Sequence, residues 1–204
     1  MFVNIDKIVN ITYNNIEYNI VTIMLYSCYN IIKIVDKLYF LKYLYKRYGG
    51  SLMSKQVDAI ELAKYVIVKM AEKGKKINHL KLQKLLYYVQ AWHLVYTNEP
   101  LISENFEAWL HGPVVRKVWD YYKKYSVMFD DLPCEEVDNI ELTEEQKEII
   151  DDVLDEYGDK TGYYLECLTH VEQPWKEARQ QGENTPISLS TMIEYYSRLI
   201  DVEK

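Results

Sequence analysis

Residues 81–101 have the sequence KLQKLLYYVQAWHLVYTNEPL, in which apolar side chains recur at helical spacing. Positions three and four apart share one face of a helix. Asn78 is a good N-cap just before this pattern, and Pro100 ends it because proline cannot continue a helix. We therefore predict a helix from about Asn78 to Thr97, with these residues on its apolar face: Leu82, Leu85, Leu86, Val89 and His93.

Helical patterns also lie on both sides of this stretch. The preceding helix is expected to end at Gly74, a C-cap residue, and to carry Val57, Ile60, Ala63, Ile67, Met70 and Ala71 on its apolar face. Thr143 and Gln146 have the spacing of a capping box, so a later helix should begin there and end at Gly158. Further helices are predicted from about Thr161 to His170, from Pro174, and from Ser188 or Ser190, the last carrying Met192, Ile193, Tyr196, Leu199 and Ile200.

Residues 106–111, FEAWLH, alternate in polarity and predict a strand. Phe106, Ala108 and Leu110 are expected to point the same way. Gly112 breaks the strand, and Pro113 suits the first turn of a following helix, which would carry Val114, Val115, Val118, Trp119 and Tyr122. Residues 125–142 look irregular, with short extended pieces. The fold class predicted is mainly α: a compact bundle of about six helices with a small β element around residues 104–111.

Residues 1–52 differ in composition from the rest of the chain, with six Lys or Arg, three Asp or Glu, and no Ala, Pro, Gln, His or Trp. We interpret them as an upstream region translated by mistake. Their Ile, Asn, Tyr and Lys have AT-rich codons, and the codons of Gly49 and Gly50 can form a ribosome-binding sequence before Met53. The alternative is a genuine extension, poorly ordered or helical, with Ile31, Ile34, Leu38, Leu41 and Leu44 on one face.

The predicted domain, residues 53–204, is acidic, with 18 Lys or Arg against 28 Asp or Glu. Negative charge repels phosphate, so nucleic-acid binding is disfavoured. It suits a basic protein partner, although net charge also simply keeps a protein in solution. The longest uncharged run, residues 18–32, is too short for a membrane span, which needs about 20 residues. Three scattered cysteines favour a reducing, cytoplasmic location.

The polar residues form no known catalytic or metal-binding motif. The four histidines, His79, His93, His111 and His170, lack the spacing of metal ligands. Cys167 and His170 could share a helix face as a nucleophile and its base, although a cysteine packs readily as a small apolar residue. We expect no enzyme activity, no cofactor and no metal site.

Charged clusters and tryptophans have ordinary structural interpretations. The acidic group around Asp151 and Asp155 is expected to be a solvated helix face, and the basic run from Lys73 to Lys76 a helix end favoured by the helix dipole. Tryptophans can anchor interfaces, but we expect core packing for Trp92, Trp109, Trp119 and Trp175.

Three segments together resemble the Panacea domain, a family that includes SocA-type antitoxins and phage-associated GepA proteins. They are residues 81–101, residues 106–115 (FEAWLHGPVV) and residues 141–179 (ELTEEQKEIIDDVLDEYGDKTGYYLECLTHVEQPWKEAR). The resemblance covers roughly residues 57–200, so residues 53–204 would be a Panacea antitoxin domain. It implies a small, mainly helical antitoxin encoded beside a toxin gene, often in a prophage.

The resemblance implies that the chain neutralises its toxin by direct protein binding. SocA-type members instead deliver the toxin to the ClpXP protease, which is the alternative. Motif positions of the family fall on these residues, most of which we expect to define the fold while some contact the toxin: Leu82, Gln83, Lys84, Leu85, Tyr87, Trp109, Gly112, Pro113, Val114, Leu168, His170, Pro174 and Trp175.

Two other classes of function remain as alternatives. A prophage-encoded transcription regulator would bind DNA in a salt-sensitive manner, which the acidic charge disfavours. An uncharacterised enzyme would require a bound metal or a reactive thiol. Neither class requires a membrane.

Overall fold

A buried helix, α4 (His79–Thr97), lies at the centre of the computed structural model, which describes residues 55–137 and 140–201. Its N-terminus is capped by the Asn78 side chain, which accepts the Lys81 N–H at 2.9 Å. Asn98 closes the helix in the left-handed conformation, at φ 60°. The predicted bounds are confirmed. The helix is buried beyond its predicted apolar face, because Gln83, Lys84 and Gln90 are buried as well.

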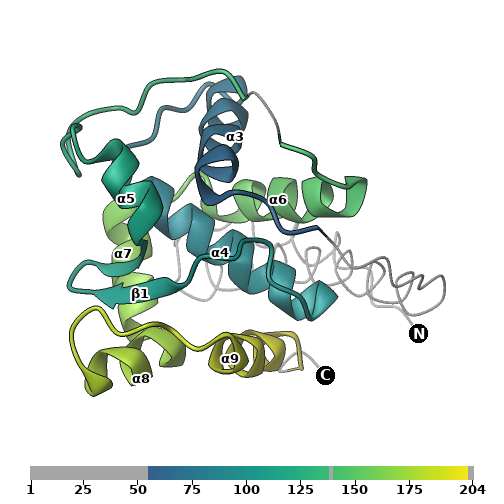
Figure 1. Ribbon diagram of the computed structural model, residues 1–204, viewed down its shortest axis with the longest axis vertical. Helices are drawn as coiled ribbons and strands as arrows, with labels where there is room; N and C mark the ends of the chain where they lie inside the picture. The colour runs from purple at the N-terminus through teal and green to yellow at the C-terminus, as the bar shows by residue number, and fades with distance from the viewer. Residues whose placement is uncertain (1–54, 138–139, 202–204) are drawn as a thin grey trace, which may run out of the picture. The chain divides into compact units, whose positions relative to one another are not determined.

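Six further helices are present in the described residues: α3 (Ala59–Glu72), α5 (Arg116–Tyr122), α6 (Glu144–Tyr157), α7 (Gly162–Val171), α8 (Gln173–Gln181) and α9 (Leu189–Asp201). Helix α4 packs against α3, α5, α6, α7 and α9, and α8 packs against α7, α9 and the hairpin. In Figure 1, α3 and α5 lie above α4, and α8 and α9 lie below it. The prediction of a mainly α fold with a small β element is confirmed.

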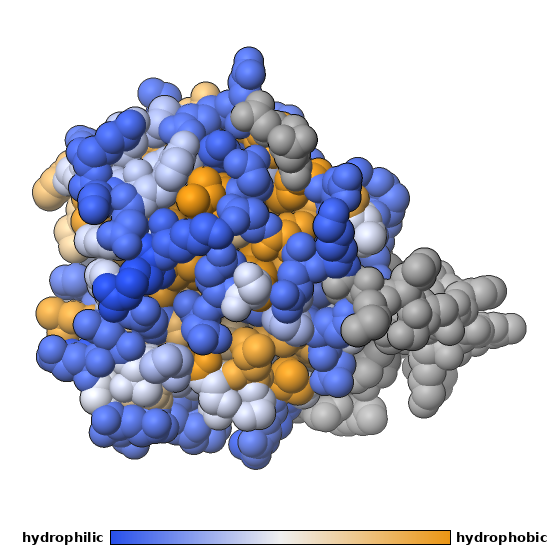
Figure 2. Space-filling model, viewed as in Figure 1, coloured by the Kyte–Doolittle hydropathy of each residue, from blue (hydrophilic) through white to orange (hydrophobic). Residues whose placement is uncertain are grey.

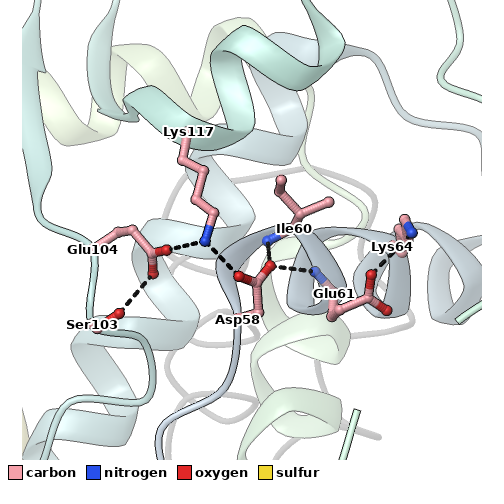
Figure 3. A network of polar contacts seen from close by, with 7 residues as sticks. All are labelled: Asp58, Ile60, Glu61, Lys64, Ser103, Glu104 and Lys117. Carbon is pink, nitrogen blue, oxygen red and sulfur yellow. Dashed lines mark hydrogen bonds and ion pairs between the residues drawn. The ribbon is translucent and has the colours of Figure 1, made fainter. Parts of the chain in front are cut away.

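Helix α3 begins at Ala59 and not at Val57. The side chain of Asp58 caps it by accepting the N–H groups of Ile60 and Glu61, while Val57 forms a bridge with Ile102. Figure 3 shows how this start is held: Lys117 of α5 contacts Asp58 at 2.5 Å and Glu104 at 2.6 Å. At the other end, Ala71 is exposed and does not join the apolar face.

The β element is a hairpin of β1 (Phe106–Trp109) and β2 (Gly112–Val115), paired from Phe106 with Val115 to Trp109 with Gly112. The prediction that Pro113 opens a helix carrying Val114 and Val115 is therefore wrong. A proline is tolerated in a strand at an edge, and Pro113 occupies such a strand. Leu110 lies in the turn, where its side chain is 65% exposed instead of pointing with Phe106.

The second edge of β1 is covered by the segment before α9. The backbone of Ile187 donates to the Phe106 oxygen at 2.7 Å, and Ala108 donates to the Thr185 oxygen at 2.8 Å. Covered edges do not recruit foreign strands. The hairpin is thereby fixed between α4 and the C-terminal part of the fold.

Helix α6 begins with the predicted capping box of Thr143 and Gln146. Its acidic face is partly exposed, and Asp151 pairs with Lys69 while Asp155 pairs with Lys73 at the end of α3. Just beyond the two helices, Lys75 pairs with Asp159. Those lysines therefore do more than complement their own helix dipole. Exposed pairs of this kind stabilise a fold only slightly.

The last helix, α9, is capped by Ser188, whose hydroxyl accepts the Thr191 N–H. Met192 and Tyr196 face the core as predicted, whereas Leu199 is 42% exposed. Residues 125–137 and 140–142 form no regular element, as predicted. The interpretations of residues 1–52 lie outside the described residues.

The surface in the view of Figure 1 is mainly hydrophilic. Figure 2 shows polar residues over most of this face, with apolar residues gathered in its middle. Helices long and apolar enough to cross a membrane are absent from the described part of the chain.

Candidate functional site

Gln83 and Lys84 are polar residues buried inside the apolar helix α4. The side-chain oxygen of Gln83 accepts the Val115 N–H at 2.9 Å. The Nζ of Lys84 donates to the Pro113 carbonyl oxygen at 3.0 Å. Buried backbone groups are costly when they lack a partner. These two side chains satisfy such groups of β2 and so tie the hairpin to α4.

Gly112 packs directly against the Lys84 side chain. Its φ of 92° lies in the region that favours glycine. A Cβ added there would lie 2.7 Å from the Lys84 Cε and 2.8 Å from the Thr169 Oγ1. The hairpin turn thus encloses the ammonium group. Burial lowers the pKa of Lys84 to about 7, although the nearby Glu166 carboxylate favours the charged form.

Glu166 and His111 connect the hairpin turn to α7 on the outer side of this cluster. Their side chains approach within 2.8 Å, between the His111 Nδ1 and the Glu166 Oε1. Glu166 is largely buried, and the His111 side chain is half exposed. The turn is therefore held by two contacts: Lys84 bonds the Pro113 carbonyl oxygen, and Glu166 bonds the His111 side chain.

Trp109, His170 and Trp175 join the end of β1 to the junction of α7 and α8. The indole Nε1 of Trp175 donates to the Trp109 carbonyl oxygen at 3.1 Å. The His170 imidazole stacks on Trp175, with ring centroids 4.1 Å apart. Pro174, at the first turn of α8, is buried beside them. These contacts of Trp175 with Trp109 and His170 fix the orientation of the hairpin relative to α7 and α8.

The other motif residues lie inside the fold. Tyr87 contacts Phe106 of β1, with ring centroids 5.4 Å apart. Four are buried and Leu168 is partly buried: Leu82, Leu85, Tyr87, Val114 and Leu168. The structure thus brings most of the motif residues together where the hairpin meets α4, α7 and α8. Nine of the thirteen are buried, and four are partly exposed: Trp109, Leu168, His170 and Trp175.

Glu172 is a buried acid that the sequence did not single out. Its two carboxylate oxygens accept hydrogen bonds from the hydroxyls of Tyr88, at 3.2 Å, and Tyr196, at 2.7 Å. Burial raises the pKa of Glu172 to about 7, although both hydrogen bonds favour the charged form. No local pattern could have predicted this group, because its members lie on α4, before α8 and on α9.

An exposed apolar face on α7 was also missed. Tyr163, Tyr164 and Val171 are 72%, 50% and 64% exposed, and Cys167 is exposed as a free thiol. Residues 163, 167 and 171 are four apart and so share one face of a helix. That spacing is present in the sequence, where only Cys167, with His170, suggested a functional site.

The hypothesis of a nucleophile pair is not supported by the arrangement of these side chains. Cys167 contacts Tyr163, whereas His170 stacks on Trp175.

The four tryptophans, expected in the core, are each partly exposed at its edge. Within residues 55–137 and 140–201, no group of three or more His, Cys, Asp or Glu side chains is placed to hold a metal ion.

Comparison with known proteins relates this site to one family. Residues 82–176 match the family described as antitoxin SocA-like, Panacea domain. Over 58 residues the chain is 43% identical to Antitoxin SocA of Caulobacter vibrioides (strain NA1000 / CB15N). That alignment spans 28% of this chain and 31% of the relative, so the chain matches about a third of its length. No solved structure matches the chain.

The matched residues coincide with the centre of the structure. They begin in α4 beside Gln83 and Lys84, include the hairpin and α7, and end just after Trp175. Over residues 82–176, this chain therefore matches the Panacea domain family of SocA-like antitoxins.

Proposed function

We propose that this chain is an antitoxin that neutralises the protein toxin of a neighbouring gene by binding it directly. The observation that carries the proposal is the match of residues 82–176 to an antitoxin family. The antitoxin relative from Caulobacter supports it over the aligned third of its length. The rest of that protein's activity is transferred here only as part of the proposal.

The arrangement of the polar groups supports binding over catalysis. Lys84, the most chemically perturbed amine, is fully buried beneath Gly112 and has no access to a substrate. Glu172 is enclosed by two tyrosines. A catalytic group must reach the atom on which it acts, and neither of these does. We therefore propose that the protein acts without catalysis and without a cofactor.

Charge and thiols support the remaining parts of the proposal. The excess of acidic residues in positions 53–204 disfavours binding to nucleic acid. Cys134 and Cys167 are free and exposed, which suits the reducing cytoplasm. The toxin is accordingly proposed to be a cytoplasmic protein partner.

The experiment is a growth rescue with the full chain. Each reading frame adjacent to the gene is induced alone and then together with this protein, and colonies are counted. A control gene carries an early stop codon, so that transcription is matched and protein is absent. Rescue that requires the intact protein supports the antitoxin proposal. If no neighbour is toxic, or if both proteins are soluble and growth is not restored, the proposal is wrong.

An immunoblot of the toxin separates direct neutralisation from the alternative of a ClpXP adaptor. Direct binding leaves the toxin level unchanged during rescue and yields a complex that co-purifies. An adaptor lowers the toxin level, and deletion of ClpX then abolishes rescue.

A further inference from the structure

Helix α7 has an outward face with an unusual composition for this acidic domain. Its exposed side chains include Tyr163, Tyr164, Cys167 and Val171. The helix has no lysine or arginine, and its single acidic residue, Glu166, turns inward to His111. An exposed apolar cluster of this kind commonly marks an interaction site.

The hairpin turn extends this face. Leu110 is 65% exposed at the tip. The next residue, His111, contacts Glu166 of α7 at 2.8 Å. The tip therefore lies along α7. We use the name α7 face for this surface: Leu110, His111, Tyr163, Tyr164, Cys167 and Val171.

The motif residues form the support beneath the α7 face. Lys84 fixes the hairpin turn at Pro113, and Trp175 fixes the backbone of Trp109. A rigid surface loses little conformational entropy when it binds, which favours affinity. The motif residues would then lie in the interior because their role is to hold the α7 face in place.

The size and chemistry of the α7 face suit a protein partner. A tyrosine buries about 150–250 Å² when it is covered fully, and tyrosines are common anchors at the centre of interfaces. The two tyrosines with Leu110 and Val171 supply the apolar centre of an interface of standard size, about 800 Å² per partner. The acidic remainder of the domain favours a partner of opposite charge.

We propose that the α7 face is the docking surface for the toxin, and that the toxin is a basic protein that presents apolar side chains to Tyr163, Val171 and Leu110. This inference rests on the proposed antitoxin function. A second copy of this chain is a less suitable occupant, because its own acidic charge would oppose association.

The test compares charge substitutions on and off the α7 face in the full chain. Tyr163→Glu and Val171→Glu place a charge on the α7 face. Phe129→Glu is the matched control, because Phe129 is 88% exposed and lies on the loop after α5. All three positions are exposed, so circular dichroism should show unchanged folding. The probe is the neighbouring toxin that the unaltered protein neutralises, and affinity is measured by calorimetry.

We expect Tyr163→Glu and Val171→Glu each to weaken binding by about 30-fold or more, the loss typical of a central interface residue, and to abolish growth rescue. Phe129→Glu should bind like the unaltered protein. If the unaltered protein rescues growth and both α7 variants bind as tightly, the docking surface is wrong while the antitoxin function stands. If light scattering shows a dimer that Tyr163→Glu separates without loss of toxin binding, the α7 face holds a second copy and the inference is overturned.

Discussion

Gly112 is the residue at which the hairpin turn meets the buried lysine. Gly112→Ala must adopt a positive φ, which costs about 1–3 kcal/mol, and must also displace Lys84 or Thr169. Gly74→Ala is the matched control, since Gly74 has a φ of 71° with no atom within 4 Å of an added Cβ. Chemical denaturation should show a larger loss of stability for Gly112→Ala. Equal losses would show that the turn does not pack tightly on Lys84.

Glu172 should make stability depend on pH in a defined direction. Its pKa is raised from 4.5 to about 7 in the folded protein, so the folded state binds its proton more tightly than the unfolded state does. The stabilisation is therefore complete below about pH 4.5 and is lost as the pH rises through about 7. Glu172→Gln mimics the neutral acid. It should raise the free energy of unfolding at pH 8 by at most about 3 kcal/mol, with little effect at pH 4.5.

Thermal unfolding at several pH values checks the role of Glu172. Glu136→Gln, at an exposed position, is the control for the loss of one negative charge. The raised pKa of Glu172 is contradicted if both substitutions change the melting temperature equally at every pH.

At the scale of a single element, the capping box should stabilise the start of α6. The Thr143 hydroxyl accepts the Gln146 N–H, and the Gln146 side-chain oxygen accepts the Thr143 N–H. Thr143→Ala should destabilise the protein by about 1 kcal/mol, whereas Thr143→Ser keeps the hydroxyl and should cost much less. Urea unfolding measures both. A Ser variant as unstable as the Ala variant would mean that the methyl group matters and the cap does not.

Elements with local signals could be predicted from the sequence. The Asn78 cap, Pro100 and the capping box each act within a few residues, so the bounds of α4 and the start of α6 were visible. The hairpin was not, because Pro113 suits a helix start equally well. What places it in a strand is distant: the β2 backbone is bonded by Gln83 and Lys84 of α4.

The site was predictable as a set of residues but not as an arrangement. Family resemblance supplied the motif positions, and the structure places them mainly in the interior. The α7 face escaped notice because exposed tyrosines resemble core tyrosines in a sequence. Only the fold shows that Tyr163 points outward while Tyr88 and Tyr196 enclose an acid.

The molecule as a whole combines an acidic surface with an uncharged α7 face, and the two should influence different rate constants for toxin binding. Long-range attraction accelerates encounter and is screened by salt, since the Debye length falls from about 10 Å at 0.1 M to about 3 Å at 1 M. The association rate should therefore fall as salt is raised. The dissociation rate should change little, because the proposed contact is apolar. Stopped-flow measurements between about 0.05 and about 1 M NaCl, which span this range of Debye lengths, test both rate constants. A dissociation rate that rises steeply with salt would instead place ion pairs at the centre of the interface, away from the α7 face.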